Sequence, residues 1–283
     1  MRVVRKREDG YHDLETIFYP VYGLHDTLVV NRRDGESVNR EESVNREETT
    51  FQCDGLAVDC AEEDNLIVRC YRQMAAHYSQ IGSVDVHFTK NIPFGAGLGG
   101  GSSDAAHMAI ALNELFRLGL SKEQLAAEVR SLGADCPFFI YNTPCFAEGI
   151  GDILTPIDFS LKGKRLIMLK PDVAVSTRDA YAGIQVAVNR GCGESVNRWL
   201  RTTVDNIGEL VNDFETTVFA CHPLLAQIKK HLLDAGAFYA AMSGSGSTVF
   251  GLFEDDAESS ADTYLGRLDK EFAAMVIFND TLG

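Results

Sequence analysis

The sequence lacks the features that direct a chain to or across a membrane. None of its apolar runs approaches the roughly 18 consecutive residues that a membrane-spanning helix needs. The segment Met1–Arg7 carries four basic groups and no apolar run follows it, which is unlike a secretory signal peptide. We therefore expect a cytoplasmic protein with no membrane partner.

Positive charge is scarce. Lysine and arginine number 26 against 41 aspartate and glutamate residues, so the formal net charge is −15. Such a surface repels a phosphate backbone, and nucleic acid is not expected as a partner. A single nucleotide is not excluded, because backbone N–H groups can hold its phosphates. We expect a small-molecule substrate, and a chain that is a monomer or a weak homodimer.

Paired cysteines are missing as well. The seven cysteines include no CxxC pair, and an odd number cannot all form disulfides within one chain. They are typical of reduced, mostly buried thiols in a cytosolic protein. The cysteine and histidine spacings fit no zinc-ligand pattern, so no metal site made by side chains is predicted.

A chain of 283 residues is long enough for two domains. We predict the division at 1–150 and 151–283, with strands and helices in an α+β arrangement. The hydrophobic periodicity and the turn signals predict strands over 28–30, 84–88, 165–170, 237–242 and 248–253. Helices are predicted from Asp64 as N-cap to Tyr78, from near Ser103 to Gly119, from Ser121 to Gly133 (with a Ser121/Gln124 capping box), and over 222–233.

Two polar stretches are predicted to lack regular structure, the first as a solvated loop or a hairpin tip and the second as a loop. Residues 31–50 are strongly charged, and residues 189–198 are polar. The string ESVNR occurs at 36–40, 42–46 and 194–198, and these copies are too short to build a repeat fold.

The most informative segment is Pro93–Ala106, PFGAGLGGGSSDAA. It places five glycines directly before an amphipathic helix, where glycine permits positive φ and close approach of a ligand to the backbone. Backbone N–H groups, the helix dipole and two hydroxyls can then converge on phosphate or on a metal-bound oxygen. The residues expected to hold a nucleotide's phosphates are Pro93, Gly95, Gly97, Leu98, Gly99, Gly100, Gly101, Ser102 and Ser103.

Three other interpretations of this tract are weaker. A flexible linker would not be followed at once by an amphipathic helix. Gly95, Gly97 and Gly100 satisfy GxGxxG, but the acidic residue about 20 positions on, Glu114, falls within a helix rather than at a strand end. A P-loop needs a GK[ST] triplet, and the chain has none.

The tract resembles the phosphate loop of the GHMP kinases, a family named after the galacto-, homoserine, mevalonate and phosphomevalonate kinases. A late glycine-rich turn of that family is matched by 241–247, AMSGSGS, at the other end of the chain. The resemblance implies ATP and Mg²⁺ as cofactors. No carboxylate in the sequence is clearly a metal ligand, so we expect Mg²⁺ to be held mainly by phosphates. It implies a ribosomal-S5-like N-terminal ATP domain and a ferredoxin-like α/β sandwich as C-terminal domain.

Other segments are similar to the branch of the family whose alcohol substrate carries a cytidine diphosphate. They are 9–14 (DGYHDL), 133–139 (GADCPFF) and 171–177 (PDVAVST) with Tyr181. The resemblance implies that Tyr11 and Tyr181 enclose the cytosine, since a base can stack on an aromatic ring on each face. It implies that His12 bonds the edge of the base, and that Thr177, Gly244 and Ser245 contact the rest of the substrate.

The same resemblance makes Asp135 the catalytic base that takes the proton of the substrate hydroxyl. On the residues alone, the favoured interpretation of a carboxylate at that place is that it braces a loop or caps a helix. Asn65 and Lys90 match family positions near the adenosine.

The family normally also has a lysine in an AKINLxL segment ahead of DGYHxL, and Lys6 lies too close to Tyr11 to match it. A cation at the transferring phosphoryl stabilises the transition state, so we expect turnover to be lower by a factor of at least about ten without that segment. The alternatives are a kinase of the homoserine or mevalonate type and a catalytically impaired nucleotide-binding homologue.

Overall fold

The computed structural model describes residues 1–33, 49–184, 199–255, 266 and 268–283. Contacts divide the chain into two compact units that interleave along the sequence. The first comprises 1–23, 95–98 and 144–283, and the second comprises 24–94 and 99–143. The predicted division at residue 150 remains a prediction. Both units combine sheets with helices, so the α+β class is confirmed.

The second unit is built on a three-stranded sheet with the order β3–β5–β4. Strand β5 pairs antiparallel with β3 and parallel with β4. Its valines and Phe88 are buried on one face, as the alternation predicts, and the buried Lys90 closes this row at the strand's end. The strands are β3 (Thr27–Arg32), β4 (Thr50–Gly55) and β5 (Val84–Lys90).

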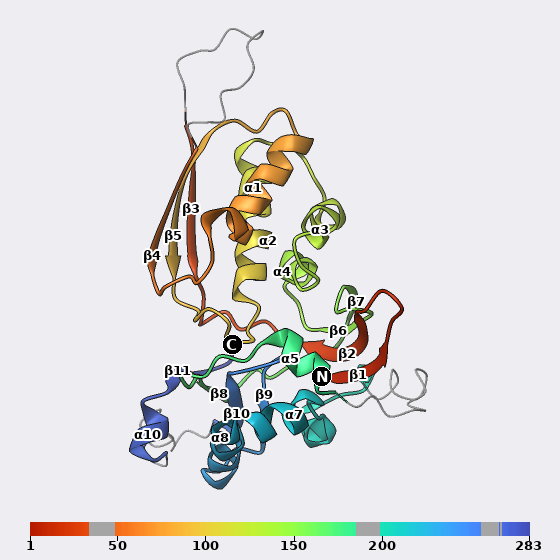
Figure 1. Ribbon diagram of the computed structural model, residues 1–283, viewed down its shortest axis with the longest axis vertical. Coiled ribbons are helices and arrows are strands. Elements are labelled where there is room, and N and C mark those ends of the chain that lie inside the picture. Colours follow the sequence, from red (N-terminus) through yellow and green to blue (C-terminus); the bar gives the residue numbers. More distant parts are fainter. Residues whose placement is uncertain (34–48, 185–198, 256–265, 267) are drawn as a thin grey trace, which may run out of the picture. The chain divides into compact units, whose positions relative to one another are not determined.

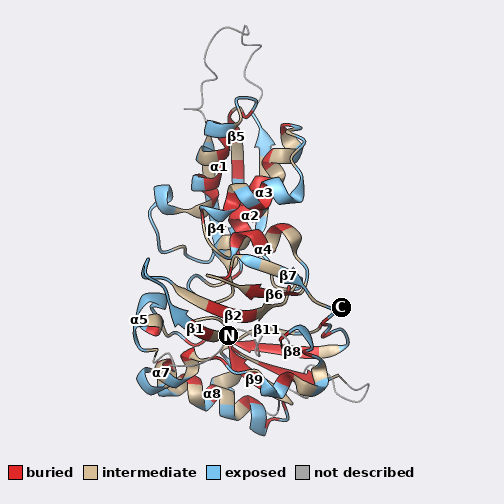
Figure 2. Ribbon diagram, turned by 90° about the vertical axis from the view of Figure 1, so that its right-hand side faces the viewer, coloured by how far each residue is buried: buried red, intermediate tan, exposed pale blue. Residues whose placement is uncertain are grey.

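Helices cover the buried face of this sheet (Figure 1). Helix α2 is central, and Figure 2 shows buried residues along much of its length. Its small alanines let neighbouring elements approach closely, which is how a helix with little amphipathic character becomes a core helix. The helices of this unit are η2 (Glu62–Asp64), α1 (Leu66–His77), α2 (Gly100–Leu115), α3 (Lys122–Arg130) and α4 (Cys136–Tyr141).

The first unit holds two four-stranded antiparallel sheets, in the orders β1–β2–β6–β7 and β11–β8–β10–β9. The strands are β1 (Arg2–Lys6), β2 (His12–Phe18), β6 (Cys145–Glu148), β7 (Ile153–Pro156), β8 (Lys164–Leu169), β9 (Tyr239–Met242), β10 (Val249–Glu254) and β11 (Val276–Thr281). Its helices are α5 (Thr177–Ala182), η3 (Val204–Glu209), α7 (Phe214–Cys221), α8 (Pro223–Asp234) and α10 (Lys270–Ala273).

Helix starts were the main errors of the sequence analysis. Asp64 is not the N-cap of α1; it belongs to η2, and the side chain of Asn65 caps α1 by accepting from the Ile67 amide at 2.9 Å. Helix α2 begins at Gly100 rather than near Ser103. Helices α2 and α3 also end before the predicted glycines, at Leu115 and Arg130. The capping box of Ser121 and Gln124 is confirmed.

The charged stretch 31–50 is not loop throughout. Asn31 and Arg32 continue β3, and Thr50 starts β4, because both strands pair with β5 along its whole length. The centre of that stretch, all three ESVNR copies and the predicted loop at 189–198 lie outside the described residues.

Candidate active site

The first half of the glycine tract is held by the late glycine-rich turn. Ser243 Oγ donates to the Gly97 carbonyl at 2.8 Å, and the Thr248 amide donates to the Ala96 carbonyl at 3.1 Å. Gly97 has φ of +74°, and a Cβ there would lie 2.4 Å from the Ser243 carbonyl oxygen. Only glycine fits this contact, which joins the two motifs that the sequence analysis singled out.

The second half of the tract is the start of a helix. Gly99 is the N-cap of α2 with φ of +69°, so Gly100 to Ser103 form the first helical turn. The N–H groups of Gly100 to Ser102 precede the first helical hydrogen bond, which the Ser103 amide donates to the Gly99 carbonyl at 2.9 Å, and the dipole adds positive potential there. The earlier start therefore places both predicted hydroxyls, Ser102 and Ser103, in the turn best suited to an anion.

A buried charge cluster lies beside that turn. Lys90 Nζ donates to carboxylate oxygens of Asp26 and, at 2.9 Å, of Asp104, and all three side chains are less than a tenth exposed. Burial raises the pKa of Asp104 to about 7, against the opposing effect of Lys90. Burial would also raise the pKa of Asp26, but hydrogen bonds from Lys90, Ile92 and Asn91 outweigh it and lower that pKa. The ammonium of Lys90, matched by resemblance to the adenosine site, is thus bound by two carboxylates.

Asp135 precedes α4 as its N-cap residue, yet its side chain makes no capping hydrogen bond. The residue is accessible, and the protein around it still displaces enough water that desolvation raises the pKa of its carboxyl group. Its turn packs against the glycine tract, since a Cβ at Gly133 would lie 3.6 Å from Ser102 Oγ. An accessible carboxylate with a raised pKa and no capping duty suits a general base.

The predicted substrate residues form two contacting pairs in the first unit. The rings of His12 and Tyr181 stack with centroids 4.9 Å apart, and Thr177 Oγ1 lies 3.0 Å from Ser245 Oγ. Thr177 and Tyr181 share one face of α5, four residues apart. Tyr11 is 62% exposed, and its backbone amide donates to Asp9 Oδ1 at 3.0 Å.

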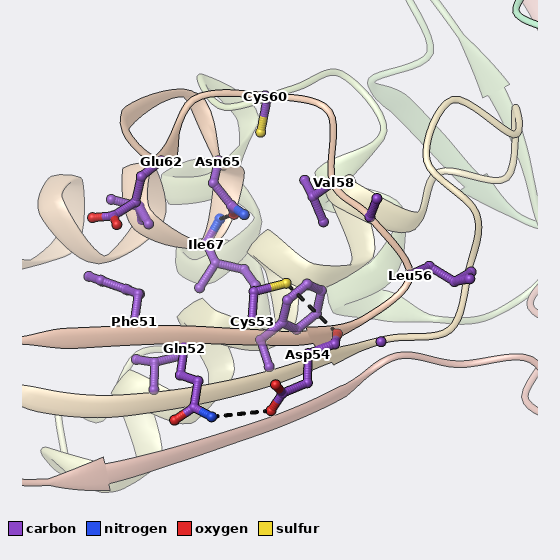
Figure 3. A pocket seen from close by; sticks show the side chains of 15 residues that line it. Phe51, Gln52, Cys53, Asp54, Leu56, Val58, Cys60, Glu62, Asn65 and Ile67 are labelled. Carbon is purple, nitrogen blue, oxygen red and sulfur yellow. Dashed lines mark hydrogen bonds between the residues drawn. The ribbon is translucent and has the colours of Figure 1, made fainter.

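An open cavity of about 460 Å³ lies in the second unit (Figure 3). Its walls come from β4, β5, the loop after β4 and the start of α1, and Cys53, Cys60 and Asn65 are among them. The Oδ1 atom of Asn65 is used as the cap of α1, which leaves its amide N–H₂ group as the available donor. The size and the mixed lining are typical of a small-molecule site.

Among the described residues, no group of three or more histidine, cysteine, aspartate or glutamate side chains could hold a metal ion. No helix in the described part of the chain is long and apolar enough to cross a membrane.

Two family matches cover much of the sequence. Residues 65–143 match the GHMP kinase N-terminal domain, and residues 187–263 match the GHMP kinase C-terminal domain. The chain belongs to the GHMP kinase family. The predicted two-domain kinase fold is thereby confirmed, as is ATP-dependent small-molecule kinase chemistry.

Individual relatives resemble this chain more closely than the family as a whole does. A protein of Bacteroides thetaiotaomicron named 4-diphosphocytidyl-2-C-methyl-D-erythritol kinase is 44% identical over 261 residues, which cover 90% of this chain and 89% of that one. A crystal structure of 4-(cytidine 5'-diphospho)-2C-methyl-D-erythritol kinase superposes with a TM-score of 0.75 at 30% identity, over 100% of this chain and 94% of that one. A homoserine kinase from Cytophaga hutchinsonii shares the fold, with a TM-score of 0.61 at 16% identity over 95% and 93%.

Two buried carboxylates beside the glycine tract, Asp104 and Asp26, were not predicted from the sequence. Asp104 lies within Pro93–Ala106. An acidic residue next to an expected anion site was itself a signal that its charge has a partner. Asp26 precedes an ordinary strand, and no local pattern pointed to it.

Proposed function

We propose that the protein transfers the γ-phosphoryl group of ATP to the 2-hydroxyl of 4-diphosphocytidyl-2-C-methyl-D-erythritol, a step of non-mevalonate isoprenoid precursor synthesis. The observation that carries this choice within the family is the stacked pair His12 and Tyr181. Aromatic side chains poised for a flat base suit a cytidine-bearing substrate, whereas homoserine and mevalonate offer nothing to stack. The names and the identities of the relatives support the same choice.

The nucleotide's phosphates would bind the glycine tract, from Pro93 to Ser103. The alternating glycines with positive φ support this, as do the N–H groups of Gly100 to Ser102, which precede the first helical hydrogen bond of α2. Mg²⁺ would be held mainly by phosphate oxygens, with the hydroxyls of Ser102 and Ser103 bonding phosphate or a metal-bound oxygen. When bound, this ion would neutralise charge that develops on the transferring group.

Asp135 would act on the nucleophile. The substrate hydroxyl oxygen forms a bond to the γ-phosphorus, the bond from that phosphorus to the β,γ-bridging oxygen breaks, and ADP leaves with the bond's electrons. The hydroxyl proton passes to the Asp135 carboxylate. Because its pKa is raised, this carboxylate accepts a proton near neutral pH more readily than an ordinary aspartate does.

The cytosine would lie between Tyr11 and Tyr181, with the imidazole of His12 at its polar edge. Desolvation and the nearby charge of Lys6 lower the pKa of His12, so at neutral pH its ring is neutral and has one donor and one acceptor. Thr177, Gly244 and Ser245 would contact the diphosphate or the methylerythritol. The link between Thr177 and Ser245 supports their joint role.

The adenosine would occupy the cavity lined by Asn65. Its apolar walls suit a base, and the spare amide of Asn65 is a donor for a ring nitrogen. Lys90 would contribute its stem or backbone, because its ammonium is already bound by carboxylates.

The test is an ADP-release assay with three alcohols at equal concentration: the cytidylated methylerythritol, homoserine and mevalonate. We expect turnover with the first alone. Faster turnover of homoserine or mevalonate would refute the substrate assignment. Binding of a non-hydrolysable ATP analogue without turnover of any of them would favour a catalytically impaired nucleotide-binding protein.

A further inference from the structure

We propose that Asp26 is a positioning residue for the phosphate loop: it fixes the turn after β5 and, through the ammonium of Lys90, the first turn of α2. The inference rests on the proposed binding of ATP phosphates at that turn. It assigns a role to a residue that lies outside every motif of the sequence.

Asp26 uses both carboxylate oxygens. Oδ1 accepts from the backbone amides of Asn91 at 2.6 Å and Ile92 at 2.8 Å, and Oδ2 accepts from Lys90 Nζ. The side-chain amide of Asn91 also donates to the His25 carbonyl at 2.9 Å. The segment before β3 therefore determines how the chain leaves β5, a few residues ahead of the glycine tract.

Lys90 links Asp26 to helix α2. Its ammonium donates to Asp104, one turn into α2, at 2.9 Å. A Cβ at Gly100 would lie 3.1 Å from Lys90 Nζ and 3.1 Å from Ile92 Cγ2, so the first residue of α2 rests directly on the two residues that Asp26 holds. A shift of Lys90 or Ile92 would thus displace the N–H groups that are expected to meet phosphate.

The charges of Asp26, Lys90 and Asp104 explain why these three side chains are held in place. Lys90 is a buried cation between two buried carboxylates, and a buried charge that loses its partner is strongly unfavourable. The hydrogen bonds that reach Asp26 from three donors lower its pKa, which keeps it charged at neutral pH. Asp26 is therefore the stable anion that fixes the ammonium, and Asp104 is the weaker acid of the pair.

The most informative variant is Asp26→Asn. Its amide oxygen can still accept from the Asn91 and Ile92 amides, while its amide nitrogen faces the Lys90 ammonium, donor against donor. Asp85→Asn is the matched control: it removes the same charge from the opposite end of β5, where Asp85 bonds Thr50 and pairs with Arg33. Asp26→Glu keeps the charge and is the second test variant, which is used if Asp26→Asn does not fold.

The measurements are calorimetric binding of a non-hydrolysable ATP analogue, and the KM values for ATP and for the alcohol. For Asp26→Asn we expect at least tenfold weaker analogue binding and a matching rise in the KM for ATP, with the KM for the alcohol within twofold. Asp26→Glu should weaken analogue binding less than Asp26→Asn does. Asp85→Asn should bind the analogue as the unaltered protein does.

Three results would overturn the inference, and they are distinguishable. If the unaltered protein binds the analogue and a folded Asp26→Asn variant binds it equally well, Asp26 has no positioning role and the proposed ATP site stands. If Asp26→Asn does not fold and Asp26→Glu binds as the unaltered protein does, the role of Asp26 is structural only. If the unaltered protein binds no analogue, the proposed function fails and this inference fails with it.

Discussion

The imidazole of His12 lies on the phenol ring of Tyr181, with ring centroids 4.9 Å apart and an interplanar angle of 21°. Phe214 packs perpendicular to the same tyrosine at 4.8 Å. Two neighbours already contact the ring on which a cytosine is expected to stack. We therefore expect the base to take the place of the imidazole, and His12 to turn its neutral ring toward the edge of the base.

This relationship predicts a substrate-specific defect for Tyr181→Ala. A stacked base gains roughly 1–3 kcal/mol from an aromatic partner, so the KM for the cytidylated substrate should rise roughly tenfold or more. The KM for ATP should stay within twofold, and Tyr181→Phe, which keeps a ring of the same shape, should restore the KM of the alcohol. The control in steady-state kinetics is Tyr22→Ala, which removes a ring that is 67% exposed. An equal rise in both KM values would contradict a role in base recognition.

Asp135→Asn should remove the proton acceptor without disturbing the fold, because the Asp135 side chain makes no capping bond. We expect a loss of roughly 10²–10⁴ in kcat with an unchanged Kd for an ATP analogue. In the unaltered enzyme, desolvation raises the pKa of Asp135, so activity should fall on acidification at a higher pH than an ordinary aspartate would give. Asp234→Asn, at an exposed helical ion pair, is the control. Retained turnover in Asp135→Asn would remove the residue from this role.

Local signals in the sequence were enough for several elements. The Ser121 and Gln124 capping box and the alternation along β5 each arise from residues close in the chain, and both predictions are confirmed. The glycine tract was also readable, because positive φ at Gly97 and Gly99 is a property of the backbone that few other residues could supply. The approach of Ser243 to Gly97 was not readable, since it depends on a contact between distant segments.

Elements stabilised by distant partners were missed. In strand β2 the adjacent residues Glu15 and Thr16 are both buried, which breaks the alternation expected of a strand. The indole N–H of Trp199, 184 residues further along the chain, donates to the Glu15 carboxylate at 3.0 Å. The pairing of Asp26 with Lys90 spans 64 residues in the same way. Charges so far apart in the sequence give no pattern that identifies them as partners, so both the strand and the cluster needed the structure.

Thiol labelling should test the cavity that is proposed to hold the adenosine. Cys53 and Cys60 are exposed and line it, and desolvation raises the pKa of both thiols, so alkylation should be slow at pH 7 and faster at pH 9. We expect an ATP analogue to slow the alkylation of these two cysteines at least fivefold, by mass spectrometry of digests. The exposed Cys221 lies outside the cavity lining and should react equally with and without the analogue. Equal labelling of Cys53 and Cys60 in both conditions would place the base elsewhere.

Asp104 should make stability fall as the pH rises. Burial raises its pKa from the ordinary 3.8 to about 7, so between these values the folded protein holds a proton that the unfolded chain has lost. This contribution is fully present below pH 3.8 and is lost as the pH rises through 7. Asp104→Asn cannot titrate, so the difference in urea stability, variant minus unaltered protein, should rise between pH 5 and pH 8 as the unaltered protein loses this contribution. A difference that grows on acidification would contradict this assignment.

Gly97→Ala and Gly95→Ala separate steric overlap from backbone strain. Both glycines have positive φ, +64° at Gly95 and +74° at Gly97, so alanine at either costs roughly 1–2 kcal/mol of backbone strain. A Cβ at Gly95 meets nothing within 4 Å, whereas at Gly97 it would lie 2.4 Å from the Ser243 carbonyl and 2.6 Å from that of Gly246. We expect Gly97→Ala to lose a further 1–3 kcal/mol of unfolding free energy in urea titrations, because the late turn must move away. Equal losses for the two variants would show that the contact between the two glycine turns is not tight.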